Sequence, residues 1–435
     1  MQTLLSPEFK GTPDGEAAQD IIRKCVHCGF CNATCPTYQL LGDELDGPRG
    51  RIYLIKQVLE GAEATRSTQQ HLDRCLTCLN CQTTCPSGVE YGHLVDIGRK
   101  IVDAQIERPA RERSLRWLLR EGLTSRLFAP AMRLGQVLRP LLPAVLQNKL
   151  PAQGVRASRS PDRRPTHRRQ VLMLAGCVQP SMMPNIDRAA VRVLDAAGIG
   201  VVYAAGAGCC GSLRSHLGDP EGGLADMRRN IDAWMSLIAA GEVEAIVSSA
   251  SACSLAIKEY SYALSGDAQY AAKAARISAL ARDLCELLPQ LVPALKDKIH
   301  HQGRERLALH SPCTLQHGQK LGGAVEPYLH ALGFEVSAAG NESHFCCGSA
   351  GAYSILQPEL ARSLRDRKLA QLAALRPQII VSANVGCIQH LQSGTDTRVM
   401  HWIEALDAAL MPPDEATPRD GATLRDTAAL PRSGA

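Results

Sequence analysis

Aromatic residues are scarce in this 435-residue sequence and make up 4% of it. Proteins that bind single-stranded nucleic acid stack the bases on aromatic side chains, so this scarcity argues against nucleic acid as a partner. Long apolar runs are also absent: no stretch of about 18 apolar residues occurs, and we expect no transmembrane segment. The net charge of +5 is modest, so the chain as a whole has no strong bias to one sign of charge.

A secretory signal peptide is missing as well. Residues 1–24 contain no apolar core of signal-peptide length, and they carry Glu8, Asp14, Glu16 and Asp20. The 17 cysteines would fit a disulfide framework only in an oxidising compartment. Their spacing, described next, requires reduced thiols instead. The sequence therefore predicts a cytoplasmic protein.

Eight of the cysteines form two copies of the pattern Cys-x2-Cys-x2-Cys-x3-Cys-Pro. They are Cys25, Cys28, Cys31 and Cys35 before Pro36, and Cys75, Cys78, Cys81 and Cys85 before Pro86. A cubane [4Fe–4S] cluster needs four thiolates, and a loop with a cysteine at every third residue supplies three of them. Paired Cys-x2-Cys also suits zinc, but zinc sites do not need the third and fourth cysteines at the same intervals twice. We therefore predict two [4Fe–4S] clusters.

The fourth ligand of each cluster is expected to come from the other loop. In proteins with two such clusters, the cysteine before the proline ligates the neighbouring cluster. This rule predicts two ligand sets: Cys25, Cys28, Cys31 and Cys85 for cluster 1, and Cys35, Cys75, Cys78 and Cys81 for cluster 2. The segment between the loops has the apolar spacing of an amphipathic helix over residues 52–59.

The second half of the chain repeats itself. Each repeat has a single cysteine, a Cys-Cys-Gly sequence and a last cysteine. The two sets are Cys177, Cys209, Cys210 and Cys253, and Cys313, Cys346, Cys347 and Cys387. Matched cysteines lie about 136 residues apart, and a constant period of this kind indicates a duplicated unit.

Each repeat has the pattern of alternating strands and helices. Short buried-type strands are expected at residues 171–174, 201–203, 245–247, 307–309 and 379–381, with a helix over 185–197. This alternation predicts a mostly parallel sheet. The cysteines follow the strands, where open α/β sheets have their ligand crevices. The expected fold class is therefore a multidomain α+β protein: an N-terminal helical domain followed by a duplicated α/β cysteine-rich domain.

Four thiolates at the ends of strands can bind a further iron–sulfur cluster or zinc, or act as a redox disulfide. Adjacent cysteines favour a metal, because a disulfide between neighbours closes a strained ring. The sets are therefore candidate ligands of an additional cluster. Cys285 has no partner in the repeat and fits a small core residue instead.

Two other patterns in this half are given less weight. Gly206–Gly211 satisfies Gly-x-Gly-x-x-Gly, and Asp226 follows at a suitable distance for a dinucleotide site. The second repeat contains only the Cys-Cys-Gly part of this pattern, however, so nucleotide binding is not favoured. His310, His317 and His344 flank the second cysteine set and can tune a cluster, but a structural role is the commoner one for such histidines.

We expect five segments along the chain. They are a helical two-cluster domain (1–105), a basic helical segment with a linker (106–169), cysteine-rich domain 1 (170–300), cysteine-rich domain 2 (301–411) and a disordered tail (412–435). The linker is the Arg-, Ser- and Pro-rich stretch 153–169.

The basic segment over residues 108–150 has an apolar stripe between its arginines. The stripe consists of Leu115, Leu118, Leu119, Leu123 and Leu127. A basic amphipathic helix can lie on the inner face of the cytoplasmic membrane. Packing on its own domain or on a partner subunit is the more favoured interpretation.

Two cluster loops followed by two Cys-Cys-Gly domains resemble the iron–sulfur subunit of bacterial glycolate oxidase, and the similarity spans Cys25 to Trp402. The sequences of residues 25–36, 315–319 and 383–387 resemble this branch most closely. Iron–sulfur subunits of lactate-utilisation systems, of anaerobic glycerol-3-phosphate dehydrogenase and of heterodisulfide reductase are also similar.

The resemblance implies an electron-transfer subunit of an oxidoreductase complex, with the substrate site on a partner. A separate flavoprotein would oxidise glycolate to glyoxylate, and this chain would pass the electrons towards a quinone-type acceptor. The subunit of a lactate or glycerol-3-phosphate dehydrogenase is an alternative, as is a thiol/disulfide enzyme of the heterodisulfide-reductase kind. Ala250 and Asn384 stand where the fullest family pattern has a further cysteine, which argues against five-thiolate chemistry.

Overall fold

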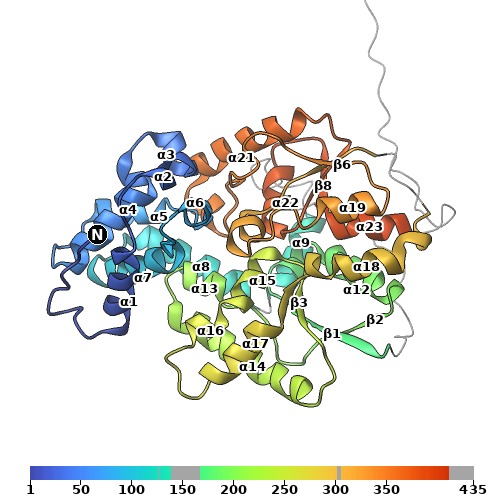
Figure 1. The fold of residues 1–435 in the computed structure, drawn as a ribbon, viewed down its shortest axis with the longest axis horizontal. Helices are drawn as coiled ribbons and strands as arrows, with labels where there is room; N and C mark the ends of the chain where they lie inside the picture. The colour runs from blue at the N-terminus through green and yellow to red at the C-terminus, as the bar shows by residue number, and fades with distance from the viewer. Residues whose placement is uncertain (126, 139–166, 301–304, 411–435) are drawn as a thin grey trace, which may run out of the picture.

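The computed structural model describes residues 1–125, 127–138, 167–300 and 305–410 (Figure 1). A helical N-terminal part, blue to cyan, lies beside two α/β parts, which run from green to yellow and from orange to red. The expected fold class is confirmed. The predicted disordered tail over 412–435 lies outside the described residues, as does most of the predicted linker over 153–169.

Within the described residues before Arg169 the structure has helices and no strand. The helices are α1 (Pro13–Arg23), α2 (Phe30–Ala33), α3 (Pro36–Leu41), the 3-10 turn η1 (Glu44–Asp46), α4 (Pro48–Leu59), α5 (Arg66–Asp73), α6 (Asn80–Thr84), α7 (Tyr91–Gln105), α8 (Ala110–Thr124) and α9 (Phe128–Val137). The predicted helix over 52–59 forms the main part of α4.

The longer helices of this part begin at recognisable caps and pack around one core. Thr12 accepts a hydrogen bond from the Gly15 N–H at the start of α1, where Pro13 supplies a fixed φ. The fully buried side chains of Ile22, Leu59 and Leu94 join α1, α4 and α7 in one apolar cluster. This core holds the two cysteine loops next to each other.

The first α/β part has a parallel sheet with the strand order β2-β1-β3-β4. Its strands are β1 (Arg169–Met173), β2 (Ile199–Val202), β3 (Ile246–Ser248) and β4 (Ala281–Asp283). Its helices are α11 (Gln179–Met182), α12 (Pro184–Ala196), α13 (Ser212–His216), α14 (Pro220–Ala239), α15 (Ser251–Lys258), α16 (Tyr260–Ala263), α17 (Ala271–Leu280), η3 (Leu284–Leu287), α18 (Leu288–Leu295) and η4 (Lys296–Lys298).

The second α/β part repeats this sheet, with the order β6-β5-β7-β8 and parallel pairs throughout. Its strands are β5 (Leu307–Leu309), β6 (Val336–Ala338), β7 (Ile379–Ser382) and β8 (Arg398–His401). Its helices are the π-turn η5 (Thr314–Gly318), α19 (Glu326–Ala331), α20 (Tyr353–Leu356), α21 (Pro358–Ala373), α22 (Val385–Gln392) and α23 (Trp402–Leu410). The duplication predicted from the cysteine period is therefore a duplication of topology.

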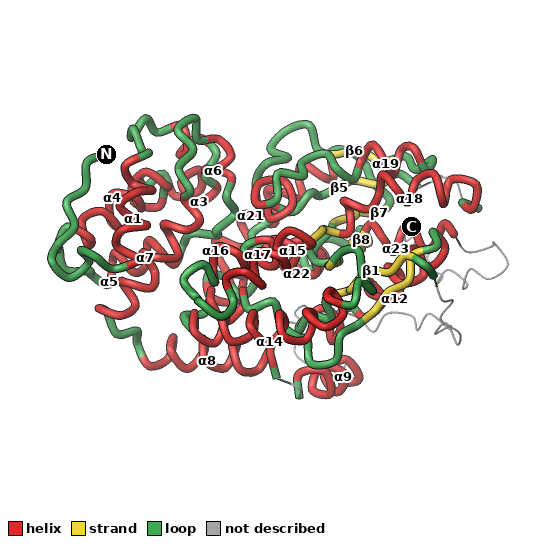
Figure 2. The backbone as a smooth tube through the Cα atoms, turned by 60° about the horizontal axis from the view of Figure 1, so that its bottom comes forward, coloured by secondary structure: helices red, strands yellow, loops and turns green. Residues whose placement is uncertain are grey.

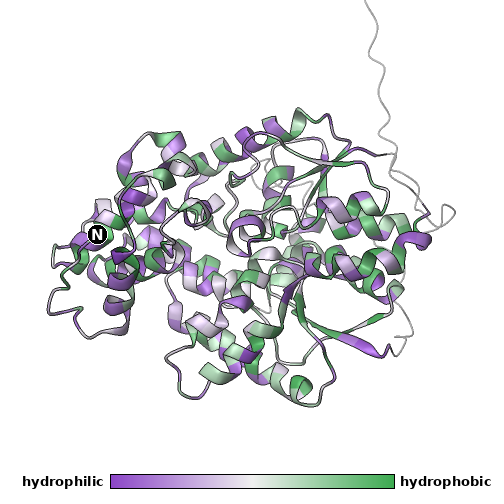
Figure 3. Ribbon diagram, viewed as in Figure 1, coloured by the Kyte–Doolittle hydropathy of each residue, from purple (hydrophilic) through white to green (hydrophobic). Residues whose placement is uncertain are grey.

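The two sheets pack through reciprocal pairs of helices. The helix after β1 (α12) contacts the helix after β8 (α23), and the helix after β4 (α18) contacts the helix after β5 (α19). Arg192 on α12 binds the carboxylate of Asp407 on α23 at 2.8 Å. Helices cover the strands of both sheets (Figure 2), and most carry both polar and apolar residues, as helices with one buried side do (Figure 3).

Several predicted elements differ in extent. The strand expected at 201–203 is β2, which begins two residues earlier and ends at Val202. The strands β4, β6 and β8 were not predicted, because polar residues interrupt their apolar sequence: they read Ala-Arg-Asp, Val-Ser-Ala and Arg-Val-Met-His. Cys285 lies in η3 with 1% of its surface exposed, as expected of a core residue.

The basic segment forms α8 and α9, and its apolar stripe is split between two environments. Leu115, Leu119 and Leu123 are half-buried, whereas Leu118 and Leu127 are exposed. The favoured packing on its own chain therefore holds for one side of the helix only. None of the described helices has the length and apolar content to cross a membrane.

Candidate iron–sulfur sites

The two cysteine loops have the same backbone conformation. In the first loop, His27 and Gly29 have positive φ angles of 59° and 86°. In the second, Thr77 and Leu79 occupy the matching positions, with φ of 51° and 61°. Positive φ is costly for residues other than glycine. Its recurrence at both matched positions indicates a loop shaped to turn successive thiols towards one point.

The thiols of the loops line two neighbouring cavities. The first is lined by four cysteines of predicted cluster 1: Cys25, Cys28, Cys31 and Cys85. The second is lined by the four of predicted cluster 2: Cys35, Cys75, Cys78 and Cys81. Cys81 also borders the first cavity, so the two lie side by side. Each group of four thus takes its last thiol from the other loop, which is the arrangement that the crossed prediction requires.

The two cavities differ in their access to solvent. Cys28 in the first is exposed, whereas Cys75, Cys78 and Cys81 in the second are buried. Burial raises the pKa values of Cys78 and Cys81 well above the usual value, and it raises that of Cys31 to about 11. Converging buried thiols of this kind are ionised only when a cation compensates their charge. Their chemistry fits a cluster whose irons supply that charge.

Cys75 is the exception, because fixed positive charges lie near it. Burial acts to raise its pKa, but Arg51 and Arg99 outweigh this effect and hold the pKa below its usual value. The Thr77 N–H points to the Cys75 Sγ at 3.4 Å, and the Tyr91 hydroxyl does so at 3.6 Å. Cluster 2 would therefore lie in a cavity with built-in stabilisation of negative charge.

Arg51 belongs to a buried network of charges that the sequence did not predict. Its side chain is 1% exposed and donates to the His71 carbonyl at 2.7 Å. The Asp46 carboxylate, also 1% exposed, binds Arg74 at 2.8 Å, His71 Nδ1 at 3.0 Å and Arg51 at 3.4 Å. The Asp46 carbonyl accepts hydrogen bonds from Thr37 and from the Cys35 thiol. The network thus connects directly to a predicted ligand of cluster 2.

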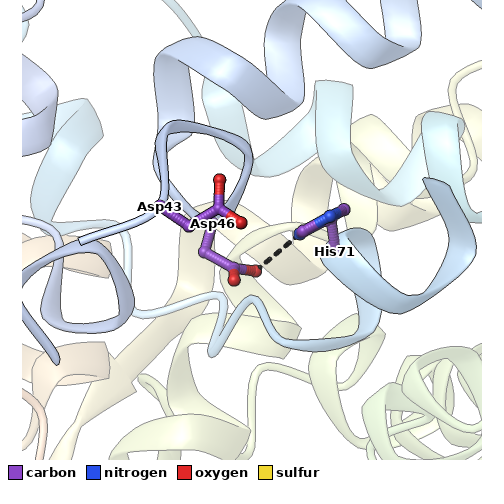
Figure 4. A group of neighbouring side chains, drawn as sticks. All are labelled: Asp43, Asp46 and His71. Carbon is purple, nitrogen blue, oxygen red and sulfur yellow. Dashed lines mark hydrogen bonds and ion pairs between the residues drawn. The ribbon is translucent and has the colours of Figure 1, made fainter. Parts of the chain in front are cut away.

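Figure 4 shows part of this network, where Asp43, Asp46 and His71 lie close together. Asp43 is exposed and caps η1 by accepting the Leu45 N–H at 2.9 Å. Asp46 is already compensated by Arg51 and Arg74, and Asp43 acts as a cap, so the cluster is explained without a metal ion.

The thiols of the first cysteine set converge beyond the carboxyl ends of β1, β2 and β3. The Sγ atoms of Cys177 and Cys209 are 3.5 Å apart. The neighbouring Cys210 thiol interacts with that of Cys253. The hydrogen bond to Cys209 and burial raise the pKa of Cys177 well above its usual value. The predicted grouping of these four residues therefore exists in the fold.

The second set has the same arrangement. The Sγ atoms of Cys313 and Cys346 are 3.8 Å apart, and Cys347 interacts with Cys387. Asn384 stands at a position where a further cysteine was expected in the fullest family pattern. Its side-chain amide points to the Cys387 sulfur at 3.6 Å. The amide therefore supplies a hydrogen-bond donor to the sulfur and no additional ligand.

The backbone conformation requires the glycine of each Cys-Cys-Gly sequence. Gly211 and Gly348 have φ angles of +94° and +88°, and each N–H points to the first thiol of its pair, at 3.5 and 3.4 Å. A Cβ atom at Gly211 would lie 2.6 Å from the Gly223 carbonyl oxygen, and one at Gly348 would lie 2.5 Å from that of Ala361. No side chain fits at either position without displacing backbone.

The second cysteine set lies directly against the cavity of cluster 2. Cys78 packs in one apolar cluster with Cys346 and Tyr353, and Cys313 borders the same cluster. Asn80 donates to the His344 carbonyl at 3.2 Å, and the Tyr353 hydroxyl donates to the Arg74 carbonyl at 3.0 Å. No local sequence signal predicts these contacts, because the residues are far apart in the chain.

The patterns that were given less weight have structural roles. Asp226 pairs with Arg229 at 2.6 Å, and the Gly208 N–H donates to Asn230. His310 contacts Ser382 at 2.9 Å, and burial lowers its pKa to about 3. His317 Nε2 lies 2.9 Å from the His344 carbonyl oxygen.

Two neighbouring cavities lined by the eight thiols of the loops, and two further thiol sets at the ends of parallel strands, define a class of iron–sulfur proteins. Residues 21–89 match the 4Fe-4S dicluster domain family, and residues 171–258 and 307–392 match the cysteine-rich domain family. The chain is 53% identical over 415 residues to the glycolate oxidase iron-sulfur subunit of Escherichia coli (strain K12). The match covers 94% of this chain and 99% of that relative. The chain therefore belongs to the family of glycolate oxidase iron–sulfur subunits, and it is an electron-transfer subunit of an oxidoreductase complex.

Two further relatives are less similar to this chain. A Bacillus subtilis (strain 168) protein named "probable glycolate oxidase iron-sulfur subunit" is 29% identical, over 89% of this chain and 91% of the relative. Lactate utilization protein A of Bacillus velezensis is 24% identical and covers only 55% of this chain.

Proposed function

We propose that this chain is the iron–sulfur subunit of a glycolate oxidase complex. A flavoprotein partner would hold the substrate site and oxidise glycolate to glyoxylate. The electrons would leave this chain towards a quinone-type acceptor, from the cytoplasmic side of the membrane. Identity of 53% over nearly the full length of a glycolate oxidase subunit supports glycolate over lactate, because the lactate utilization relative covers about half of the chain.

The proposed ligands are the eight cysteines of the two loops in the crossed arrangement. Cys25, Cys28, Cys31 and Cys85 would hold cluster 1, and Cys35, Cys75, Cys78 and Cys81 would hold cluster 2. The lining of the two cavities supports this grouping. A [4Fe–4S] cluster supplies one-electron transfer. The protein's own contribution is to position the thiols, to exclude water from the second cavity and to provide the positive charges of Arg51 and Arg99.

We further propose that the second cysteine set is the next electron carrier. The contact of Cys78 with Cys346 gives cluster 2 a direct neighbour there. Cys28 is exposed at the other end, where an external partner can approach cluster 1. The path would then run from the Cys28 side through cluster 2 to Cys313, Cys346, Cys347 and Cys387. The set of Cys177, Cys209, Cys210 and Cys253 is proposed as a further metal site of the same kind.

Anaerobic purification together with the bound partners tests the function. We expect a flavoprotein to co-purify and glycolate to reduce the iron–sulfur centres, as seen by EPR. More than eight irons per chain would assign metal to the cysteine-rich domains as well, because two [4Fe–4S] clusters account for only eight. Reduction by lactate but not by glycolate would contradict the proposed substrate. Disulfide reduction by the isolated chain would favour the thiol-enzyme alternative.

A further inference from the structure

Ion pairs hold helix α8 on the rest of the protein. Arg116 binds Asp73 at 2.9 Å. Glu121 binds Arg214 at 3.0 Å, and Arg214 also binds Asp219 at 3.0 Å. These pairs connect α8 to α5 on the helical part and to the α13–α14 region on the first α/β part. The orientation of the helix is therefore fixed from both sides.

Helix α8 and the following helix α9 also expose large apolar side chains. Trp117 is 56% exposed and Leu118 is 59% exposed on α8. Leu134 and Val137 on α9 are 60% and 64% exposed. Neither helix has a buried residue. Figure 2 shows both helices along one edge of the molecule. We call this set of four residues the apolar face.

An ordinary surface helix buries its apolar residues and exposes its charges. Helix α8 does so only in part, because Leu115, Leu119 and Leu123 are half-buried whereas Trp117 and Leu118 are exposed. Contiguous exposed apolar surface is uncommon on soluble monomers and marks an interaction site. Trp117 is the exception among the chain's three tryptophans, since Trp234 and Trp402 are both 0% exposed. The apolar face is therefore expected to be covered in the working protein.

The charges beside the apolar face are basic. Arg111 and Arg113 on α8 and Arg133 on α9 are exposed, and Arg113 pairs with the exposed Glu107 before the helix. The acidic residues of α8 are engaged elsewhere, Glu112 with Arg66 and Glu121 with Arg214. In the sequence no aspartate or glutamate occurs between Glu121 and Asp162. The surface around the face is thus complementary to an anionic one.

We propose that the α8–α9 face docks on an anionic phospholipid bilayer. Trp117, Leu118, Leu134 and Val137 enter the boundary between headgroups and acyl chains, and the neighbouring arginines contact lipid phosphates. Amphipathic helices that lie flat on membranes have this composition: an aromatic and aliphatic face with arginines or lysines beside it. A protein partner would be expected to offer acidic residues to three exposed arginines, whereas an anionic bilayer offers phosphates along the whole face. The proposal concerns membrane contact alone and holds whatever the oxidised substrate is.

Vesicle binding by the full chain, purified anaerobically with its clusters, tests the proposal. We expect the protein to co-sediment with vesicles of phosphatidylcholine and phosphatidylglycerol and to bind pure phosphatidylcholine much more weakly. Trp117 is a natural reporter, because the other two tryptophans are buried. Its emission should shift to shorter wavelength only when anionic vesicles are added.

Matched substitutions test whether binding depends on the apolar face or on any exposed apolar side chain. The double variant Leu118→Gln with Leu134→Gln keeps Trp117 as the reporter. Its partition coefficient onto anionic vesicles should fall about tenfold or more, because two inserted apolar side chains are removed. Leu4→Gln is the control: Leu4 is 81% exposed and lies in the helical part, near the N-terminus. It should bind like the wild type.

Several results would overturn the proposal. They are the absence of vesicle binding, binding without a shift in tryptophan emission, and equal binding by the double variant. Release of the flavoprotein partner by the double variant, with no effect on vesicles, would assign the face to a protein interface. A change from dimer to monomer would assign it to a second copy of this chain.

Discussion

At the scale of single residues, the candidate sites combine thiols with fixed charges. Arg51 is buried with its carboxylate partner Asp46 beside the cavity of Cys35 and Cys75. Burying a guanidinium is costly unless it is paired and hydrogen-bonded, and here both conditions are met. A positive charge held close to a cluster favours its reduced, more negative state. Arg51, together with Arg99, would therefore favour the reduced state of cluster 2.

Replacing Cys35 tests the crossed ligand assignment. In Cys35→Ser we expect the cluster of Cys75, Cys78 and Cys81 to be lost or converted to a three-iron form, because its fourth thiolate comes from the other loop. Cluster 1 should keep its EPR signal. Iron analysis together with EPR of the reduced protein measures both. Loss of the signal from the cluster of Cys25, Cys28 and Cys31 alone would disprove the assignment.

Cys285→Ala is the matched control for this experiment. Cys285 is buried, like the four proposed ligands of cluster 2, but packs in the apolar core of the α/β parts. Its replacement should leave the iron content unchanged and cost about 1 kcal/mol of stability or less, since only one sulfur is removed.

At the scale of elements, α8 binds both the helical part and the first α/β part. Asp73, at the end of α5, binds Arg108 at 2.6 Å and Arg116 at 2.9 Å, and all three side chains are at most 12% exposed. Burial acts to raise the pKa of Asp73, but the hydrogen bond from Arg108 and the charges of both arginines hold it below the usual value. The carboxylate is thus the main anchor of α8 on the helical part.

Asp73→Asn should release this anchor. Arg116 would lose its counter-charge, whereas Arg108 would retain Asp103. We expect a loss of about 3 kcal/mol in the free energy of unfolding. Amide hydrogen exchange over Ala110–Thr124 should accelerate more than exchange in the sheets.

Glu107→Gln provides the comparison for Asp73→Asn. Glu107 also forms an ion pair with an arginine of α8, but its side chain is 81% exposed. An exposed pair contributes little, so exchange in α8 should stay close to that of the wild type. Equal acceleration in both variants would show that Asp73 is not the anchor.

At the scale of the whole molecule, the two α/β parts are joined by a neutral histidine. His401, at the end of β8, is fully buried. The Ile403 N–H donates to its Nδ1 at 3.1 Å, so Nε2 carries the proton and donates to the Ser249 carbonyl of the other part at 2.9 Å. Burial lowers the pKa of His401 to about 3. The contact therefore depends on the uncharged ring.

This contact predicts a loss of stability in acid. In the unfolded chain the histidine takes up a proton near its ordinary pKa of 6.5, whereas the folded chain keeps it neutral down to about 3. The unfolded state thus binds more protons in this interval, and stability falls as the pH falls through it. Between pH 7.5 and 5.5 the contribution of His401 is about 1.4 kcal/mol.

Comparison with His401→Gln isolates this contribution. The free energy of unfolding is measured by anaerobic urea unfolding, followed by the emission of the neighbouring Trp402. The stability advantage of the wild type over the variant should be about 1.4 kcal/mol smaller at pH 5.5 than at pH 7.5. His300→Gln, which replaces an exposed histidine, is the control. Its difference in the free energy of unfolding from the wild type should be the same at both pH values. An advantage that stays constant for His401→Gln would rule out this account.

The sequence was sufficient for features set by local patterns. The cysteine spacing predicted the two loops, and buried apolar runs predicted β1, β3, β5 and β7. It missed β4, which reads Ala-Arg-Asp and is a strand only because β3 pairs with it. It also missed Arg51 as a buried charge and Tyr353 as a neighbour of Cys78. Both depend on contacts between distant segments, for which a single sequence carries no signal.

The contact between Cys78 and the second cysteine set has a consequence for biosynthesis. The loop around Cys78 leaves the ribosome early, but the residues that cover it, Cys346, Tyr353 and their neighbours, are synthesised much later. Asn80 and His344, which are joined by a hydrogen bond, are 264 residues apart in the sequence. Until that segment has been made and folded, dioxygen has direct access to this side of the site. A chain that stops before Tyr353 would keep all eight cysteines of the loops and still be left with an oxygen-sensitive cluster.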